Sequence, residues 1–153
     1  MSRRSQITMS DDEVAAFLDE QRTVICATNG RDGWPHLMPL WYVVRDGELW
    51  SWTYAKSQKV RNLERDDRVT LQVETGEQYD QLHGVMIKAR VVLHREAEDV
   101  AALGTEIFTR YTGGQSEDVK EMVAAQAPKR VAMQFVTESC ATWDHRKLGS
   151  GVY

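Results

Sequence analysis

The stretch SWTYAKSQKVRNLERDDRVTL, residues 51–71, joins a tryptophan-bearing strand to a short helix and then to a second strand. Ser57 is placed to cap that helix, and the free amides of the first turn attract anions together with the helix dipole. Lys56 and Lys59 bring positive charge to the end of a helix where it is unfavourable, by a few tenths to about 1 kcal/mol each. Thr53 adds a hydroxyl group. We therefore expect a phosphate group to bind at this turn.

The same cations allow a simpler interpretation, a solvated helix face. Four basic side chains would then point into water: Lys56, Lys59, Arg61 and Arg65. Arg65 would pair with a neighbouring carboxylate, from Glu64, Asp66 or Asp67. Because two of the cations oppose the helix dipole, this stretch alone leaves both interpretations open.

Patterns of apolar residues predict further helices and strands. Ser10 and Glu13 have capping-box spacing, which indicates the start of a helix. Apolar residues at helical spacing predict two more helices, over about 100–111 and 119–123. Six strands are expected, at residues 23–28, 34–45, 48–53, 68–74, 84–94 and 129–144.

Two local features order these strands. Asp46-Gly47 tolerates the positive φ angles of a type I′ turn and predicts a hairpin. Pro35 and Pro39 cannot donate ladder hydrogen bonds, so strand 34–45 should lie at a sheet edge or carry a bulge. Six antiparallel strands with local hairpins indicate an α+β fold, a small barrel with peripheral helices. The βαβ alternation and the G-x-G-x-x-G motif of dinucleotide-binding folds are absent.

Length and composition indicate one globular domain spanning residues 1–153. The net charge of −4 argues against nucleic-acid binding. No apolar run approaches the roughly 20 residues of a membrane span, and the first residues lack the apolar core of a secretory signal, so we expect a cytoplasmic protein. Cys26 and Cys140 lie in apolar segments without C-x-x-C spacing, and we expect two buried, reduced thiols.

The sequence offers little support for other kinds of active site. The histidines lack metal-site spacing, so no metal is expected at His36, His83, His94 or His145. There is no G-x-S-x-G motif, and the cysteines lie in apolar segments, so nucleophilic catalysis is not favoured. We assign no catalytic side chain.

The order of several short motifs resembles a known family. WPHLMPLWYVV, the Asp46-Gly47 hairpin, the K-x-x-K-x-x-N-L turn at 56–63 and R-D-D-R-V at 65–69 follow one another as in the split β-barrel superfamily of pyridoxamine 5′-phosphate oxidases. The pattern is most similar to the actinobacterial branch of flavin and deazaflavin (F420)-dependent oxidoreductases. The resemblance covers residues 10–144. It departs at His83, where an arginine is common in that branch.

The resemblance implies a fold and a cofactor site. The fold would be a six-stranded antiparallel split β-barrel with peripheral helices. The phosphate of the cofactor would bind at Lys56, Ser57 and Lys59, near Val60 and Asn62. The ring system would lie along the strand that contains Pro39, Leu40, Trp41 and Tyr42, beside Ser51 and Thr53. Such proteins are usually homodimers with the cofactor between subunits, so Trp143 of a second copy could stack on the ring.

The implied function is hydride transfer from reduced F420 to an electron-poor small organic substrate, with the ring performing the chemistry. Candidate proton donors are Tyr42, Tyr79 and His83. A basic track for the acidic tail of F420 would comprise Arg61, Arg65, Arg146 and Lys147. Three alternatives stay open: an FMN-dependent enzyme resembling pyridoxamine-phosphate oxidase, a carrier that binds F420 without turnover, and a relative that binds no cofactor.

Overall fold

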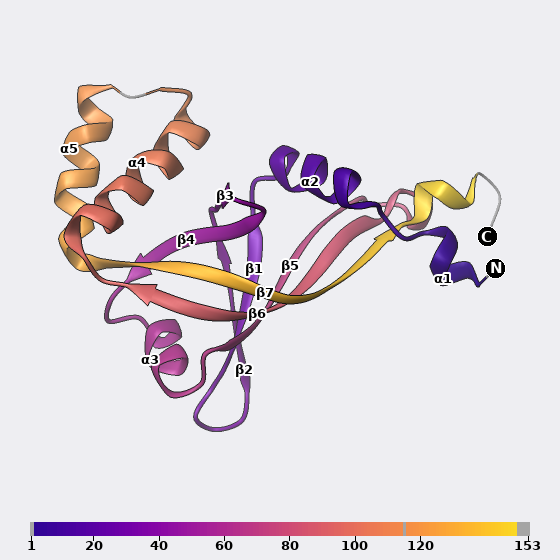
Figure 1. The fold of residues 1–153 in the computed structure, drawn as a ribbon, viewed down its shortest axis with the longest axis horizontal. Helices are drawn as coiled ribbons and strands as arrows, with labels where there is room; N and C mark the ends of the chain where they lie inside the picture. The colour runs from indigo at the N-terminus through magenta and orange to yellow at the C-terminus, as the bar shows by residue number, and fades with distance from the viewer. Residues whose placement is uncertain (1, 115, 150–153) are drawn as a thin grey trace.

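The computed structural model describes residues 2–114 and 116–149, which form a curled antiparallel sheet with helices around it (Figure 1). The seven strands lie in the order β2-β1-β5-β6-β7-β4-β3. They are β1 (Val24–Asn29), β2 (Pro35–Leu40), β3 (Val43–Arg45), β4 (Glu48–Tyr54), β5 (Arg68–Thr75), β6 (His83–His94) and β7 (Arg130–Asp144). The α-helices are α1 (Arg3–Gln6), α2 (Asp11–Glu20), α3 (Gln58–Arg65), α4 (Ala97–Thr112) and α5 (Glu117–Gln126), and three 3-10 turns are η1 (Tyr79–Gln81), η2 (Ala127–Lys129) and η3 (His145–Leu148). The α+β split-barrel class is confirmed.

The expected single strand over 34–45 is wrong, because the chain forms two strands, β2 and β3, with a break at Trp41 and Tyr42. The strand is interrupted because both backbone groups of Tyr42 form hydrogen bonds outside the sheet. Its N–H donates to the hydroxyl of Tyr111 at 3.0 Å, and its carbonyl accepts from that hydroxyl and from Arg110. Because residues of helix α4 bind the backbone groups of Tyr42, these groups cannot form hydrogen bonds within the sheet. The sheet therefore has seven strands where six were expected.

Both local predictions about this region are confirmed. Asp46 and Gly47 have φ angles of 51° and 78°, as a type I′ turn requires, and they connect β3 to β4. Strand β2, which contains Pro35 and Pro39, is an edge strand.

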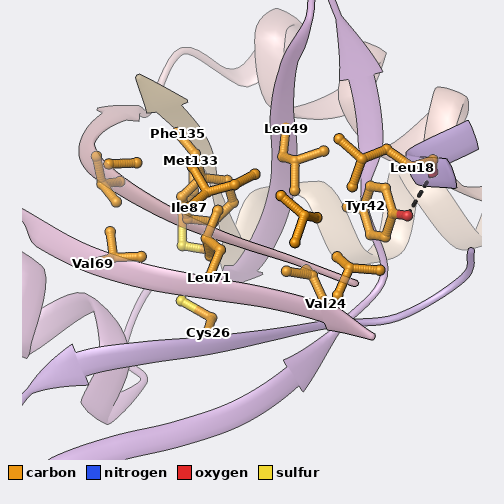
Figure 2. Close-up of a cluster of buried hydrophobic side chains, with 14 of the residues drawn as sticks. Leu18, Val24, Cys26, Tyr42, Leu49, Val69, Leu71, Ile87, Met133 and Phe135 are labelled. Atoms are coloured by element: carbon orange, nitrogen blue, oxygen red, sulfur yellow. Dashed lines mark hydrogen bonds between the residues drawn. The ribbon is translucent and has the colours of Figure 1, made fainter. Parts of the chain in front are cut away.

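Side chains on the concave side of the sheet form the main core (Figure 2). Its fully buried members include Val24, Cys26, Leu49, Leu71 and Phe135. Tyr42 also lies wholly in this core, and its hydroxyl donates to the carbonyl of Leu18 at 2.6 Å. A second cluster lies where helix α4 covers β4 and β7.

The two cysteines are free, as expected, but the prediction that both are buried is wrong for Cys140, which is exposed. Beyond Gln134, strand β7 pairs only with β6 and has no strand of the described chain on its other side, and successive residues from Val136 to Cys140 are exposed. Burial raises the pKa of the Cys26 thiol to about 12.

Arg110 joins helix α4 to the end of helix α2. One of its terminal nitrogens donates to the carbonyls of Leu18, Asp19 and Gln21, at 3.0, 2.9 and 2.8 Å. These carbonyls lie at the C-terminal end of α2, where helix acceptors lack partners within the helix and a cation is favoured. Helix α4 therefore fixes both α2 and the break between β2 and β3.

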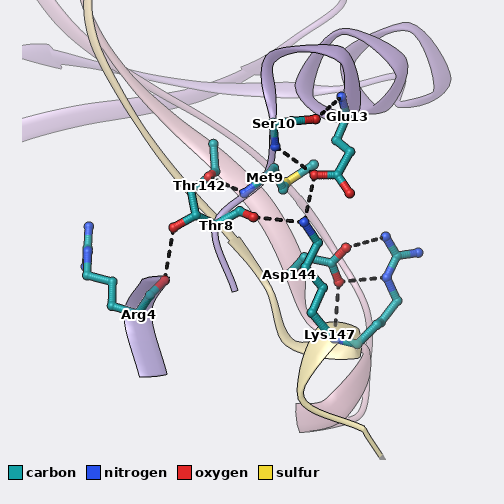
Figure 3. A network of polar contacts seen from close by, with 9 residues as sticks. Arg4, Thr8, Met9, Ser10, Glu13, Thr142, Asp144 and Lys147 are labelled. Carbon is teal, nitrogen blue, oxygen red and sulfur yellow. Dashed lines mark hydrogen bonds and ion pairs between the residues drawn. The ribbon is translucent and has the colours of Figure 1, made fainter. Parts of the chain in front are cut away.

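The N-terminal and C-terminal segments are held together by a polar network at the far end of β7 (Figure 3). Lys147 donates to the carbonyl of Thr8 at 2.8 Å and to Glu13 at 2.7 Å. The N–H of Met9 donates to the Thr142 hydroxyl at 2.9 Å. The predicted capping box of Ser10 and Glu13 is confirmed in the same region.

We expect Gly104→Ala to destabilise the protein, because an added methyl would lie 2.4 Å from the ring of Trp52, which is itself buried. Overpacking of this kind costs about 1–3 kcal/mol, which offsets the gain of roughly 1 kcal/mol from placing alanine in a helix. The free energy of unfolding in urea measures the change. Gly114→Ala is the control, since nothing lies within 4 Å of its added methyl. A variant at 104 more stable than the wild type would contradict this packing.

Candidate functional site

Helix α3 begins as the sequence predicts. The Ser57 hydroxyl accepts from the N–H of Val60 at 3.3 Å, which makes Ser57 the N-cap. Lys56 precedes the cap and is exposed, while Lys59 follows in the first turn and is buried. The turn therefore combines the amide end of a helix with two cations in different surroundings.

Lys59 carries its ammonium group into the interior. Only 4% of the residue is exposed, and Nζ donates to the hydroxyl of Thr53 at 3.2 Å. Within residues 2–114 and 116–149, no carboxylate forms an ion pair with it. Burial lowers the pKa of Lys59, and the nearby Cys26 thiol opposes that shift. A buried ammonium group with one hydroxyl partner is an arrangement that an anion would complete.

Asn62 makes the matching contact one turn later. Its amide nitrogen donates to the hydroxyl of Thr28 at 3.0 Å, and both residues are almost fully buried. Its amide oxygen accepts from Gln58 at 2.9 Å. Helix α3 is thus held to β4 by Lys59 and to β1 by Asn62.

The interpretation of the basic residues as a solvated face is wrong for Lys59, which is buried, whereas Lys56, Arg61 and Arg65 are exposed. The expected local pairing of Arg65 is also wrong. Arg65 instead donates to the carbonyl of Asn29. The three carboxylates offered for Arg65 bind other arginines: Asp66 binds Arg68, Asp67 binds Arg90 and Glu64 binds Arg95. Arg68 is two residues from Asp66, whereas Arg90 in β6 and Arg95 after it are distant in the sequence and could not be predicted from this stretch.

Ser51 and Trp41 lie together at the break between β2 and β3. The Ser51 hydroxyl donates to the carbonyl of Trp41 at 2.6 Å. The Trp41 ring is 45% exposed and stacks on Tyr111, with centroids 4.4 Å apart. The preceding residues Pro39 and Leu40 are exposed and half-buried. This segment therefore offers an aromatic surface beside the end of strand β4.

Tyr42 differs from its neighbours. Its side chain is fully buried, its hydroxyl is bonded to the end of α2, and both of its backbone groups are engaged by α4. Burial raises the pKa of its phenol. Tyr42 therefore has neither a free backbone group for a ligand nor a readily released proton.

Other predicted residues lie at the opposite end of the sheet. Trp143 pairs with Gly84 near the end of β7, whereas Thr53 pairs with Val131 at its start. His83 and Tyr79 lie beside that far end, and Nδ1 of His83 is 2.7 Å from the carbonyl of Gln81. One chain alone does not bring these side chains to the turn at Lys59.

The basic residues that were expected to bind the acidic tail do not all lie together. Arg146 forms an ion pair with Asp144 at 2.8 Å, and Lys147 forms one with Glu13 at 2.7 Å, both at the far end of β7. The structure instead places Lys129 and Arg130 beside the turn, because the N–H of Ala55 donates to the carbonyl of Lys129 at 2.9 Å. The sequence analysis missed both, since only the pairing of β4 with β7 reveals them.

The guanidinium group of Arg130 lies over two aromatic rings. Its guanidinium carbon lies 4.1 Å from the ring centroid of Tyr54 and 4.6 Å from that of Trp52. Its Nε is buried without a hydrogen-bond partner. In the described part of the chain, neither Arg130 nor Lys129 has an ion-pair partner.

Comparisons with known proteins bear on this architecture. The family model for pyridoxamine 5′-phosphate oxidase matches residues 10–144. The chain belongs to that family. No curated protein matches the sequence.

Among solved structures, a conserved hypothetical protein from Mycobacterium tuberculosis is 42% identical, with a TM-score of 0.91, and the match covers 100% of this chain and 96% of that one. An F420 reductase is 19% identical, with a TM-score of 0.67 and coverage of 82% and 93%. A FAD-binding protein from Mesorhizobium loti is 18% identical, with a TM-score of 0.65 and coverage of 88% and 94%. The last two likenesses show the fold alone.

Across the described residues, no cluster of three or more histidine, cysteine, aspartate or glutamate side chains could hold a metal ion. None of the helices in that part of the chain is long and apolar enough to cross a membrane.

We expect Lys59→Met to leave the free energy of unfolding unchanged or to raise it by up to about 2 kcal/mol at pH 7, because the variant buries no charge. Since the Lys59 pKa is lowered, the unfolded chain binds more protons between that pKa and 10.5. The difference from wild type should therefore be full below the lowered pKa and shrink as pH rises through it towards 10.5. Urea unfolding at several pH values measures this difference.

Val60→Ala is the control. Val60 is a fully buried neighbour of Lys59, and the substitution should lower the free energy of unfolding by roughly 1–3 kcal/mol. A clear loss of stability in Lys59→Met would contradict the expectation, because it would show that the hydrogen bond to Thr53 stabilises the fold by more than the buried charge costs.

Proposed function

We propose that this protein binds the deazaflavin coenzyme F420 and transfers hydride from its reduced form to an electron-poor small organic molecule. The observation that carries the proposal is the buried ammonium of Lys59, which has a hydroxyl partner but no counterion in the described chain. A phosphate bound at the N-terminus of α3 would supply that counterion. Family membership supports a flavin-type cofactor, and the fold shared with an F420 reductase is consistent with the choice of F420.

The residues present fit the phosphate group. Lys59 and Lys56 would supply charge, and Ser57 and the first amides of α3 would supply donors and hold the position. Thr53 orients Nζ of Lys59. Val60 and Asn62 fix the helix on the sheet, Val60 by its buried side chain and Asn62 through Thr28.

Lys129 and Arg130 strengthen the choice of F420 over FMN. F420 carries carboxylates beyond its phosphate, and FMN does not. These two cations lie next to the turn and have no carboxylate partner in the described chain, so they would meet the acidic tail. The rings of Tyr54 and Trp52 keep the guanidinium of Arg130 in place, which favours contacts to carboxylates in a fixed plane.

The ring system would lie along Pro39, Leu40 and Trp41, where strand β2 ends, with Ser51 fixing the carbonyl of Trp41. The bound deazaflavin supplies the hydride chemistry, and the protein supplies orientation and exclusion of water. We also propose a homodimer, in which Trp143 of a second copy reaches the ring. The position of Trp143 at the far end of β7 makes a second copy necessary for that contact.

Titration of the purified protein with F420 and, separately, with FMN tests the proposal. We expect saturable quenching of tryptophan fluorescence by F420. Lys56→Ala with Lys59→Met should weaken binding roughly a hundredfold or more, because the variant removes two charge-assisted hydrogen bonds of about 1.5–3 kcal/mol each. Arg3→Ala is the control, since it removes an exposed cation from helix α1, which lies far from helix α3 in Figure 1, and should leave affinity nearly unchanged.

The outcomes separate the alternatives. Tighter binding of FMN than of F420 would favour an FMN-dependent enzyme resembling pyridoxamine-phosphate oxidase. Binding of F420 without oxidation of its reduced form, across a panel of enones and quinones, would favour a carrier. If neither cofactor binds, the proposal fails.

A further inference from the structure

A cavity of about 630 Å³ lies between helix α2 and residues 137–142 of strand β7. Its volume is within the range of small-molecule sites. Here β7 has no strand of the described chain beside it on the side away from β6, and the next contact along that edge is the N–H of Asp144, which donates to the carbonyl of Ile7 at 2.7 Å. Helices α2 and α3 lie apart in Figure 1, so this cavity is separate from the turn at Lys59.

Apolar side chains form much of the wall, and several of them are open to solvent. Helix α2 contributes Val14, Ala15 and Leu18, which are half-buried, exposed and buried in turn. Val44 of β3 is 41% exposed, and Cys140 of β7 is exposed as well. A ligand that enters from solvent therefore contacts these side chains directly. Removing its apolar surface from water would favour binding.

The charges at the cavity favour a cation. Asp11 and Asp19 line it from the same helix, whereas no lysine or arginine of the described chain does so. Neither carboxylate forms an ion pair with a described residue. The two ends differ, because Arg110 donates to the backbone carbonyl of Asp19 at 2.9 Å and brings positive charge there. Asp11 is therefore the better anchor for a positive group.

The position of Asp11 also sets the direction in which a ligand would lie. Cys140 pairs with Ile87 across the β6–β7 ladder, so its side chain is on the core face of the sheet. Partial desolvation raises the pKa of the Cys140 thiol, and the negative charge of Asp11 adds to that shift. Asp11 and Asp19 are eight residues apart, roughly 12 Å along the helix axis. An apolar body therefore has room to extend from Asp11 along the helix.

We propose that this cavity binds a small amphiphilic amine, a molecule with an elongated apolar body and one protonated amino group. The ammonium group pairs with Asp11, and the apolar body lies against Val14 and Ala15 and points towards Val44. An anion of the same shape is disfavoured, because both carboxylates at the cavity repel it. This site goes beyond the proposed function, since it uses neither the turn at Lys59 nor the segment at Trp41.

Fluorescence titration with dansylcadaverine, an apolar dye on an alkyl chain that ends in a primary amine, tests the site. Dansyl-6-aminohexanoate is the matched ligand, because it carries the same dye on a similar chain that ends in a carboxylate. We expect a saturable blue shift with the amine and at least tenfold weaker binding of the carboxylate. Saturating amine should also slow the reaction of Cys140 with N-ethylmaleimide several-fold, while the buried Cys26 stays unreactive in the folded protein.

Two variants test the two parts of the site separately. Asp11→Asn should weaken binding of the amine about three- to fivefold, as expected for the loss of an ion pair near the surface. Asp12→Asn is its matched control, because Asp12 is exposed in the same helical turn and does not line the cavity. Ala15→Trp should weaken binding at least tenfold by filling the cavity. Ala16→Trp is its control, because Ala16 lies on another face of α2.

The outcomes decide the inference independently of the proposed function. Lys56→Ala with Lys59→Met should leave amine binding intact, and the changes at 11 and 15 should leave F420 binding intact. If Ala15→Trp does not fold, Asp11→Asn against Asp12→Asn still tests the site. Absence of saturable binding of the amine would overturn the inference, and so would equal affinity for the carboxylate analogue. Unchanged affinity in Asp11→Asn would overturn it as well.

Discussion

Hydrogen bonds from Lys59 to Thr53 and from Asn62 to Thr28 hold helix α3 against the sheet. Taking an ammonium group out of water without a counterion is unfavourable, so this contact is a costly way to fix a helix. The cost makes sense if the ammonium serves a ligand. The same hydroxyl that orients Lys59 also lies at the end of β4, next to the amide end of α3. The hydrogen bond between Lys59 and Thr53 thus fixes both where the candidate site lies and where its positive charge is held.

The rest of the fold supports this corner from the side of α4. Gly104 lets the helix approach Trp52 closely, and Trp52 carries the guanidinium of Arg130 beside the turn. Farther along α4, Arg110 and Tyr111 bind the backbone of Tyr42 and end strand β2. Helix α4 therefore positions both Arg130, beside the turn at Lys59, and the exposed aromatic surface at Trp41.

Features set by neighbouring residues could be predicted from the sequence. The N-cap at Ser57, the turn at Asp46-Gly47 and the edge strand with its prolines follow from local chemistry, and each is confirmed. The break at Tyr42 could not be predicted, because its partner Tyr111 lies 69 residues away. Nor could the burial of Lys59, the approach of Arg130 or the pairing of Arg146 with Asp144 at the far end of β7, since each depends on which strands pair and on how far they extend.

Measuring the pKa of Lys59 tests most directly whether its buried ammonium binds a phosphate. NMR of the labelled Lys59 side chain during a pH titration gives this pKa. Without a ligand, the pKa should lie below the usual 10.5 because of burial. Saturation with F420 should raise it, since a phosphate stabilises the charged form. An unperturbed pKa in the free protein, or a lowered one that F420 leaves unchanged, would contradict the claim that a buried ammonium at this turn serves the phosphate.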